Sequence, residues 1–155
     1  MKFRFILIIA LALFFSASSF AQDKPAWITS VENTIKRKET SWKIENKIER
    51  PQDNSYSFTL KSGNTTASIE ITAYREIANP EETFTGQITV FDTTIGKSMK
   101  KTELVNFGNE GYIWTGSKVT YAMIMFRKDK VFVRIFAPSE KIARRFAQYV
   151  FEQIP

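Results

Sequence analysis

In two neighbouring stretches of the chain, every second residue is apolar and the residues between them are mostly polar. The apolar positions are Tyr56, Phe58, Leu60, Ile69, Ile71 and Ala73. Because successive side chains of a strand point to opposite faces, this pattern predicts two strands that each bury one face. Ser62-Gly63-Asn64 lies between the two runs, and a turn sequence of this kind predicts that they form a hairpin.

The stretch before them, Ser41 to Arg50, has the same period but a less decisive pattern. Trp42, Ile44 and Ile48 share one parity, while charged residues fill most of the other. We expect a strand whose charged face is solvated. A continuation of the preceding helix is the alternative.

Apolar residues recur every three or four positions near both ends of the mature chain, which predicts two amphipathic helices. The first helix is expected to end at about Lys38, and its apolar positions are Trp27, Ile28, Val31 and Ile35. The last helix opens at Pro138-Ser139. Its apolar positions are Ile142, Ala143, Phe146, Ala147, Val150 and Ile154.

A further helix is predicted to begin at Asn79-Pro80-Glu81-Glu82. Asn can cap a helix, Pro suits the first helical position, and the carboxylates complement the positive end of the helix dipole. The apolar stripe that follows comprises Phe84, Ile88, Phe91, Ile95 and Met99. Thr and Gly lower the intrinsic helix propensity here, so the helix should depend on docking against the rest of the protein.

The C-terminal third predicts more strands. Val119 to Phe126 and Val131 to Ala137 are the clearest, and Tyr121 to Phe126 has no polar side. A strand of that kind is expected inside the sheet, covered on both faces. Leu104 to Trp114 is interrupted by glycines and predicts short strand pieces around a turn.

The predicted order is helix, three strands, helix, two or three strands, helix. Short turns between neighbouring strands favour antiparallel pairing. We therefore expect an α+β fold: a single antiparallel, curved sheet of about five to six strands, with two to three amphipathic helices packed on it. Residues 22–155 are expected to form this single domain.

Residues 1–21 have the features of a cleaved signal peptide. Lys2 and Arg4 precede an apolar run of 11 residues, Phe5 to Phe15, and Ser19-Phe20-Ala21 is a small-x-small cleavage site. A membrane anchor is the alternative, but a spanning helix needs about 20 apolar residues. The sequence therefore predicts export, to a periplasm or to the outside of the cell.

The chain contains no His and no Cys. This composition excludes Ser-His-Asp triads, Cys nucleophiles and ordinary zinc or haem sites. No phosphate-binding glycine motif is present. We expect no cofactor, no metal and no catalytic residue. The absence of these residue types and motifs favours a protein that is not an enzyme.

The best candidate for recognition is the glycine-rich aromatic segment from Phe107 to Gly116. Tyr112 and Trp114 offer broad faces with polar tips, which are common at binding surfaces. Packing of both rings in the core or under a sheet edge is nevertheless favoured over contact with a ligand. Glu110 is the only acid in the segment, and a hydrolytic role would need a second acid about 5–10 Å away.

Arg134 shares its strand parity with Phe132 and Phe136, so it is expected on an otherwise apolar face. A charge in that position needs a partner. We expect an internal carboxylate partner, and a contact with an anionic ligand is the alternative.

The mature chain is moderately basic. Without Lys2 and Arg4, 20 of the 22 basic residues remain against 16 acidic ones, a net charge of +4. Nucleic-acid binding usually shows a denser basic stripe, so no nucleic-acid partner is expected. Weak association with anionic envelope surfaces is compatible with this charge.

Three functions follow from these patterns. The first is a non-catalytic exported module that binds a protein, a peptide or an envelope component, with Tyr112, Trp114, Glu110 and Arg134 as candidate contact residues. The second is a carboxylate-dependent hydrolase acting on glycans. The third is a cationic protein that associates with anionic surfaces.

Overall fold

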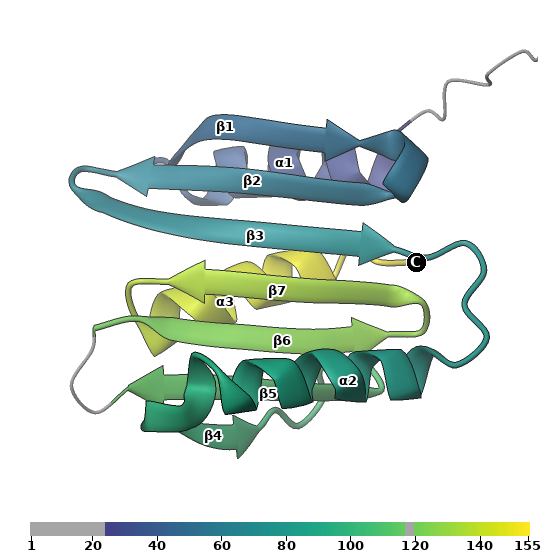
Figure 1. Ribbon diagram of the computed structural model, residues 1–155. Helices are drawn as coiled ribbons and strands as arrows, with labels where there is room; N and C mark the ends of the chain where they lie inside the picture. The colour runs from purple at the N-terminus through teal and green to yellow at the C-terminus, as the bar shows by residue number, and fades with distance from the viewer. Residues whose placement is uncertain (1–23, 117–119) are drawn as a thin grey trace, which may run out of the picture.

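The computed structural model describes residues 24–116 and 120–155 (Figure 1). Its seven strands form one antiparallel sheet in the order β1-β2-β3-β7-β6-β5-β4, and three helices pack on it. The predicted α+β fold is confirmed. The expectations for the leader, 1–21, and for Val119 lie outside the described residues.

The helices and strands alternate in groups along the chain. In order they are α1 (Ala26–Lys38), β1 (Lys43–Arg50), β2 (Ser55–Ser62), β3 (Thr65–Ala73), α2 (Pro80–Thr93), β4 (Met99–Glu103), β5 (Glu110–Gly116), β6 (Ala122–Lys128), β7 (Val131–Ala137) and α3 (Glu140–Phe151). The sheet has one strand more than the upper expectation because β4 forms where we expected the end of a helix.

The three helices cover the two faces of the sheet unequally. Figure 1 shows α1 and α3 behind the sheet and α2 in front of it, over β5 and β6. Two apolar clusters fill the space between the layers. The smaller cluster lies under α2 and comprises Phe84, Ile88, Phe91, Trp114, Met123, Met125 and Phe132. None of the three described helices lies over β1, β2 or β3 on this side, which we call the open side of the sheet.

The prediction of an interior strand near the C-terminus is confirmed by β6. This strand pairs with β5 on one side and β7 on the other. Its residues 122–126 are all buried, because Met123 and Met125 face α2 while Ile124 and Phe126 belong to the larger cluster on the α1 and α3 side.

Residues Lys43–Arg50 form a strand whose charged side chains are exposed, as expected, but Ile48, predicted on the apolar face, is 47% exposed. A bulge between Ile44 and Asn46 shifts the register. Lys47 and Glu49 then lie opposite buried residues of β2, on the face that α1 covers. A one-residue shift exchanges the two faces of a strand, which period two alone cannot reveal. Ile48 consequently lies on the open face.

The apolar stripe of α2 is also shorter than predicted. Phe84, Ile88 and Phe91 are buried, but the helix ends at Thr93 and a 3₁₀ turn follows at Gly96–Ser98. Ile95 is therefore exposed and Met99 begins β4. The apolar spacing continued through Gly96, a residue that favours the end of a helix.

Candidate functional site

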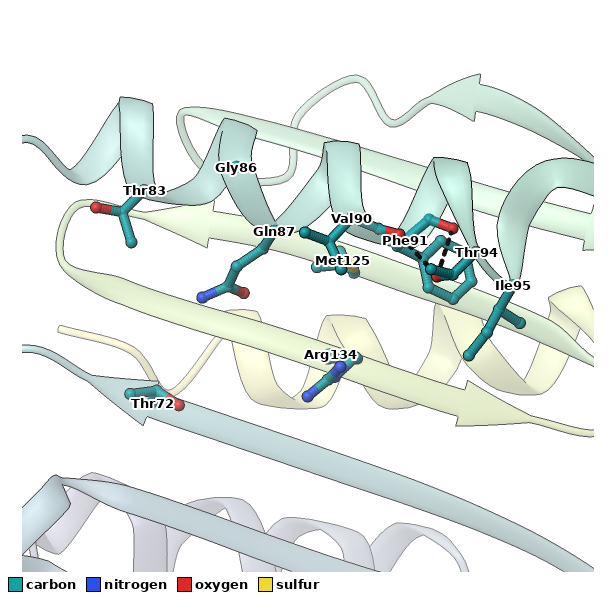
Figure 2. A pocket seen from close by; sticks show the side chains of 10 residues that line it. All are labelled: Thr72, Thr83, Gly86, Gln87, Val90, Phe91, Thr94, Ile95, Met125 and Arg134. Atoms are coloured by element: carbon teal, nitrogen blue, oxygen red, sulfur yellow. Dashed lines mark hydrogen bonds between the residues drawn. The ribbon is translucent and has the colours of Figure 1, made fainter.

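A groove of about 560 Å³ runs along α2 on the open side of the sheet. We call it the α2 groove, and the residues that define its chemistry are Thr72, Gln87, Val90, Ile95, Met125 and Arg134. Figure 2 shows the α2 side chains forming one wall, with Arg134 and Thr72 on the strands below. Its volume lies within the range of about 300–1,000 Å³ that is usual for ligand sites.

The start of α2 is fixed by local hydrogen bonds. The Asn79 side chain accepts a bond from the backbone N–H of Glu82 at 3.3 Å, and its amide donates to the Glu82 carboxylate at 2.8 Å. Pro80 occupies the first helical position. These features are the helix-start signals of the sequence, and they set where the groove wall begins.

The other end of α2 is held to the sheet by a polar contact. Trp114 of β5 donates from Nε1 to Oδ1 of Asp92 at 2.7 Å, and Lys101 donates to Oδ2 of the same carboxylate at 2.7 Å. Trp114 is fully buried and its ring packs against Phe91 at 4.9 Å between centroids. Its side chain is thus part of the support for α2 and is not available to a ligand on the folded surface.

Arg134 lies on the floor of the groove, paired with Glu70 of β3. Arg134 Nη2 and Nε lie 2.5 and 2.8 Å from Oε2 of Glu70. The expected internal carboxylate partner is therefore Glu70. Both side chains are about half exposed, so the pair faces the open groove. An exposed pair of this kind contributes little to stability.

The α2 wall is more apolar than its composition suggests. The hydroxyls of Thr83 and Thr94 donate to the backbone carbonyls of Asn79 and Val90, one turn earlier. Since these hydroxyl hydrogens are used inside the helix, the Thr side chains offer chiefly methyl groups to the groove. Val90 is 64% exposed and Ile95 is 54% exposed, which adds two unpacked aliphatic side chains.

Two polar groups of the groove have no partner within the described part of the chain. They are the side-chain amide of Gln87 on α2 and the hydroxyl of Thr72 on β3. Both line the groove beside the Arg134–Glu70 pair. The groove thus combines a polar strip on its floor with an apolar strip along its wall.

The remaining candidate residues lie on β5, away from the groove. Tyr112 is half-buried and has the Lys101 ammonium 4.3 Å from its ring centroid. Glu110 accepts a hydrogen bond from Arg127 Nε at 2.9 Å. The structure therefore groups Glu110, Tyr112 and Trp114 on one strand and places Arg134 by itself in the α2 groove.

Glycine in the aromatic segment allows its backbone to lie close to the backbone of Arg127. Gly108 has a φ of +70°, and a Cβ there would lie 2.2 Å from the carbonyl oxygen of Arg127. The next residue, Asn109, donates its N–H to that same oxygen at 2.8 Å. The segment before β5 is thus pressed onto the end of β6, a packing role that requires glycine.

The groove residues other than Arg134 were missed by sequence reasoning. Gln87, Val90 and Thr72 carry no motif, and their meeting depends on which strands α2 covers. One signal was available: Val90 is a large apolar residue that lies outside the stripe formed by Phe84, Ile88 and Phe91. An apolar residue off the buried stripe of an amphipathic helix is expected to face solvent or a ligand.

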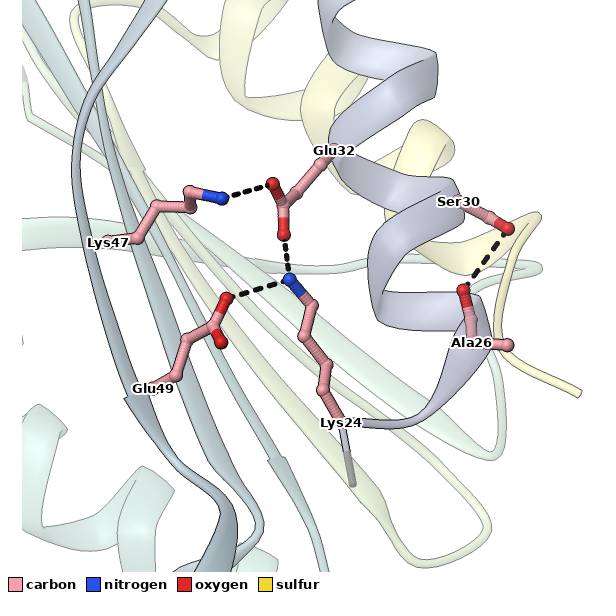
Figure 3. Close-up of polar contacts among 6 residues, drawn as sticks. All are labelled: Lys24, Ala26, Ser30, Glu32, Lys47 and Glu49. Carbon is pink, nitrogen blue, oxygen red and sulfur yellow. Dashed lines mark hydrogen bonds and ion pairs between the residues drawn. The ribbon is translucent and has the colours of Figure 1, made fainter. Parts of the chain in front are cut away.

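A second polar cluster lies between α1 and β1 (Figure 3). Lys24 contacts Glu32 and Glu49, and Lys47 donates to the other oxygen of Glu32 at 2.8 Å. Burial alone would raise the pKa of Glu32, but the hydrogen bonds and positive charges of Lys24 and Lys47 outweigh it and hold the pKa below its usual value. A general acid needs a raised pKa, so this carboxylate is suited to an ion pair.

Two neighbouring basic side chains of α3 are paired with carboxylates. Arg144 pairs with Glu140 at 2.7 Å, and Arg145 lies 2.7 Å from Glu39. Within residues 24–116 and 120–155, no group of three or more acidic side chains could hold a metal ion. None of the helices described has the length and hydrophobicity needed to cross a membrane.

A scan against protein-family models finds no match, and searches of curated proteins and of solved structures find none either.

Proposed function

We propose that this protein is an exported, non-catalytic binding domain and that the α2 groove is its binding site. The observation that carries this proposal is the pair of exposed aliphatic side chains, Val90 and Ile95, on the wall of a groove of about 560 Å³. Exposed apolar groups beside unpaired polar groups are characteristic of ligand sites. Export is proposed from the leader at 1–21.

The side chains present support binding more than catalysis. The chain has no His and no Cys, so acid–base chemistry would rely on carboxylates, Lys or Tyr. Glu110 is paired with Arg127, and Glu70 is paired with Arg134. A carboxylate whose oxygens are engaged by a guanidinium is poorly placed to contact a glycosidic oxygen, as the acid in glycan hydrolysis must.

The groove can be tested by site-specific photocrosslinking in the compartment where the native protein resides. A photoreactive phenylalanine analogue replaces Val90 in one variant and Val105 in the control. Val105 is 75% exposed and lies in the loop between β4 and β5, outside the groove. We expect a discrete crosslinked product at position 90 and none at position 105.

Equal crosslinking at both positions, or none at position 90, would contradict the proposed site. The proposal of export is tested separately by the intact mass of the protein isolated from its native cells. The expected mass is that of a chain beginning at Gln22. A mass that still includes residues 1–21 would contradict it.

A further inference from the structure

The two strips of the α2 groove restrict the chemistry of its ligand. An acyl chain would cover the Gln87 amide and the Thr72 hydroxyl without offering them a hydrogen bond, which is unfavourable for buried polar groups. A sugar would place hydroxyls against Val90 and Ile95, the two exposed aliphatic groups. A ligand that fits both strips carries amides and apolar groups side by side.

The charges of the groove point to an uncharged ligand. Among the described residues, Arg134 is the one charged residue that lines it, and Glu70 pairs with Arg134 at 2.5 Å. The protein as a whole has a formal net charge of +6, yet the groove presents a balanced pair. A charged ligand would gain no net attraction here, and separating the pair to bind it would cost their mutual interaction.

The length of the wall indicates how long the ligand is. From Thr83 to the end of α2 at Thr93, the helix advances about 15 Å at about 1.5 Å per residue. An extended chain advances about 3.3 Å per residue, so the wall spans about four to five residues of it. Side chains on one side of such a chain can face Val90 while its amides face Gln87.

We propose that the α2 groove binds an uncharged, extended peptide segment of a partner protein, about four to five residues long. Aliphatic side chains of this segment lie against Val90 and Ile95. Its backbone amides exchange hydrogen bonds with the Gln87 amide and the Thr72 hydroxyl, which otherwise have no partner in the described residues. This inference rests on the proposed function and names the ligand of the same site.

The test uses a library of N-acetylated, C-amidated pentapeptides made of Ala, Ser, Thr, Gln, Val, Ile and Leu. Three further probes are a matched library with Asp or Lys at two positions, maltopentaose, and phosphatidylcholine vesicles. NMR shifts of isotopically labelled protein report the contact residues. We expect the uncharged library to shift the signals of Gln87, Val90 and Ile95, with less than a two-fold change in apparent affinity between 0.05 and 0.5 M NaCl.

Variants identify the groove as the site of these shifts. Val90→Glu should weaken binding of the uncharged library at least ten-fold, whereas Val105→Glu should change it less than two-fold, because Val105 lies outside the groove. Gln87→Ala keeps the apolar wall and should weaken binding three- to ten-fold. Circular dichroism checks that each variant is folded, and Gln87→Ala replaces Val90→Glu if the latter unfolds.

The outcomes separate this inference from the proposed function. Groove shifts that come only from the charged library, the sugar or the vesicles would overturn the peptide ligand and keep the binding site. The peptide ligand is also overturned if no probe shifts the groove while crosslinking at position 90 succeeds. Failure of that crosslinking overturns the proposed function itself.

Discussion

The indole N–H of Trp114 donates to Asp92 at 2.7 Å, and this bond ties α2 to β5. The ring is fully buried, while the carboxylate lies at the rim and also binds Lys101. Asp92 therefore gives the groove wall directional contacts to both β5 and β4, in addition to its apolar packing on the sheet.

Replacing Asp92 with Ala should lower the free energy of unfolding by about 1–3 kcal/mol, because the buried Trp114 N–H loses its acceptor. Asp92→Asn keeps an oxygen acceptor and loses only the exposed contact with Lys101, which is worth about 0–1 kcal/mol. Urea unfolding monitored by Trp fluorescence measures both. Equal losses in the two variants would mean that the indole bond contributes nothing.

Tyr56 is fully buried, and its hydroxyl has no hydrogen-bond partner among the described residues. Tyr56→Phe removes an unpaired polar atom, so the free energy of unfolding should stay unchanged or rise by about 1 kcal/mol. Tyr149→Phe is the matched control, since the Tyr149 hydroxyl donates to the buried Glu39 at 2.9 Å. The control should lose about 1–3 kcal/mol. A comparable loss at position 56 would reveal a partner for that hydroxyl.

Gly86 lies in the middle of α2, and a Cβ placed there meets no atom within 4 Å. Gly86→Ala should therefore raise the free energy of unfolding by about 0.5–1 kcal/mol, since Ala has the higher helix propensity. Gly108→Ala should instead destabilise by about 1–3 kcal/mol or more, because of its positive φ and the contact at 2.2 Å. Thermal unfolding of both variants tests the contrast. A destabilised Gly86→Ala would show that the helix requires glycine there.

The Lys24–Glu32 cluster predicts how stability depends on pH. The folded pKa of Glu32 lies below its usual 4.5, so its contribution is present above that pH and is lost as the pH falls through the folded pKa. For Lys24, burial opposes the charge, but Glu32 and Glu49 raise the pKa above 10.5, so its contribution is lost only as the pH rises beyond that value. The cluster stabilises the fold between these limits.

Glu32→Gln tests this dependence. At pH 7 the variant should be less stable than the wild type by about 1–3 kcal/mol, and the difference should shrink at pH 3. Glu140→Gln, which breaks the half-exposed pair with Arg144, should show a small difference at both pH values. A Glu32→Gln deficit that stays constant from pH 7 to pH 3 would rule out the ion pair as its cause.

The elements that the sequence predicted well are those in which pattern and burial agree. The alternation at Tyr56, Phe58 and Leu60 became β2, and the helix-start signals at Asn79 and Pro80 became the start of α2. In each case the residues that set the structure are neighbours in the chain. Local signals of this kind can be read without knowledge of the tertiary fold.

The errors occurred where distant residues decide the outcome. The bulge beside Ile44 turns Lys47 toward α1, where Glu32 pairs with it, and leaves the apolar Ile48 exposed. Trp114 packs in the core, as one of the two interpretations of the sequence had it, but that α2 is the helix covering it could not be read from a local pattern. The α2 groove was unpredictable for the same reason, since Thr72 and Gln87 meet only after the helix has docked.

The sheet consists of two groups of sequence neighbours joined by one long-range pairing. Every strand pairs with its neighbour in the chain except at β3 and β7, where Ile69 lies opposite Ile135, 66 positions later. Closing so long a loop is entropically costly, so this pairing should form late and limit the rate of folding. Because β7 follows β1, β2 and β3 in the chain, the two groups of strands can join into one sheet only after β7 has been synthesised.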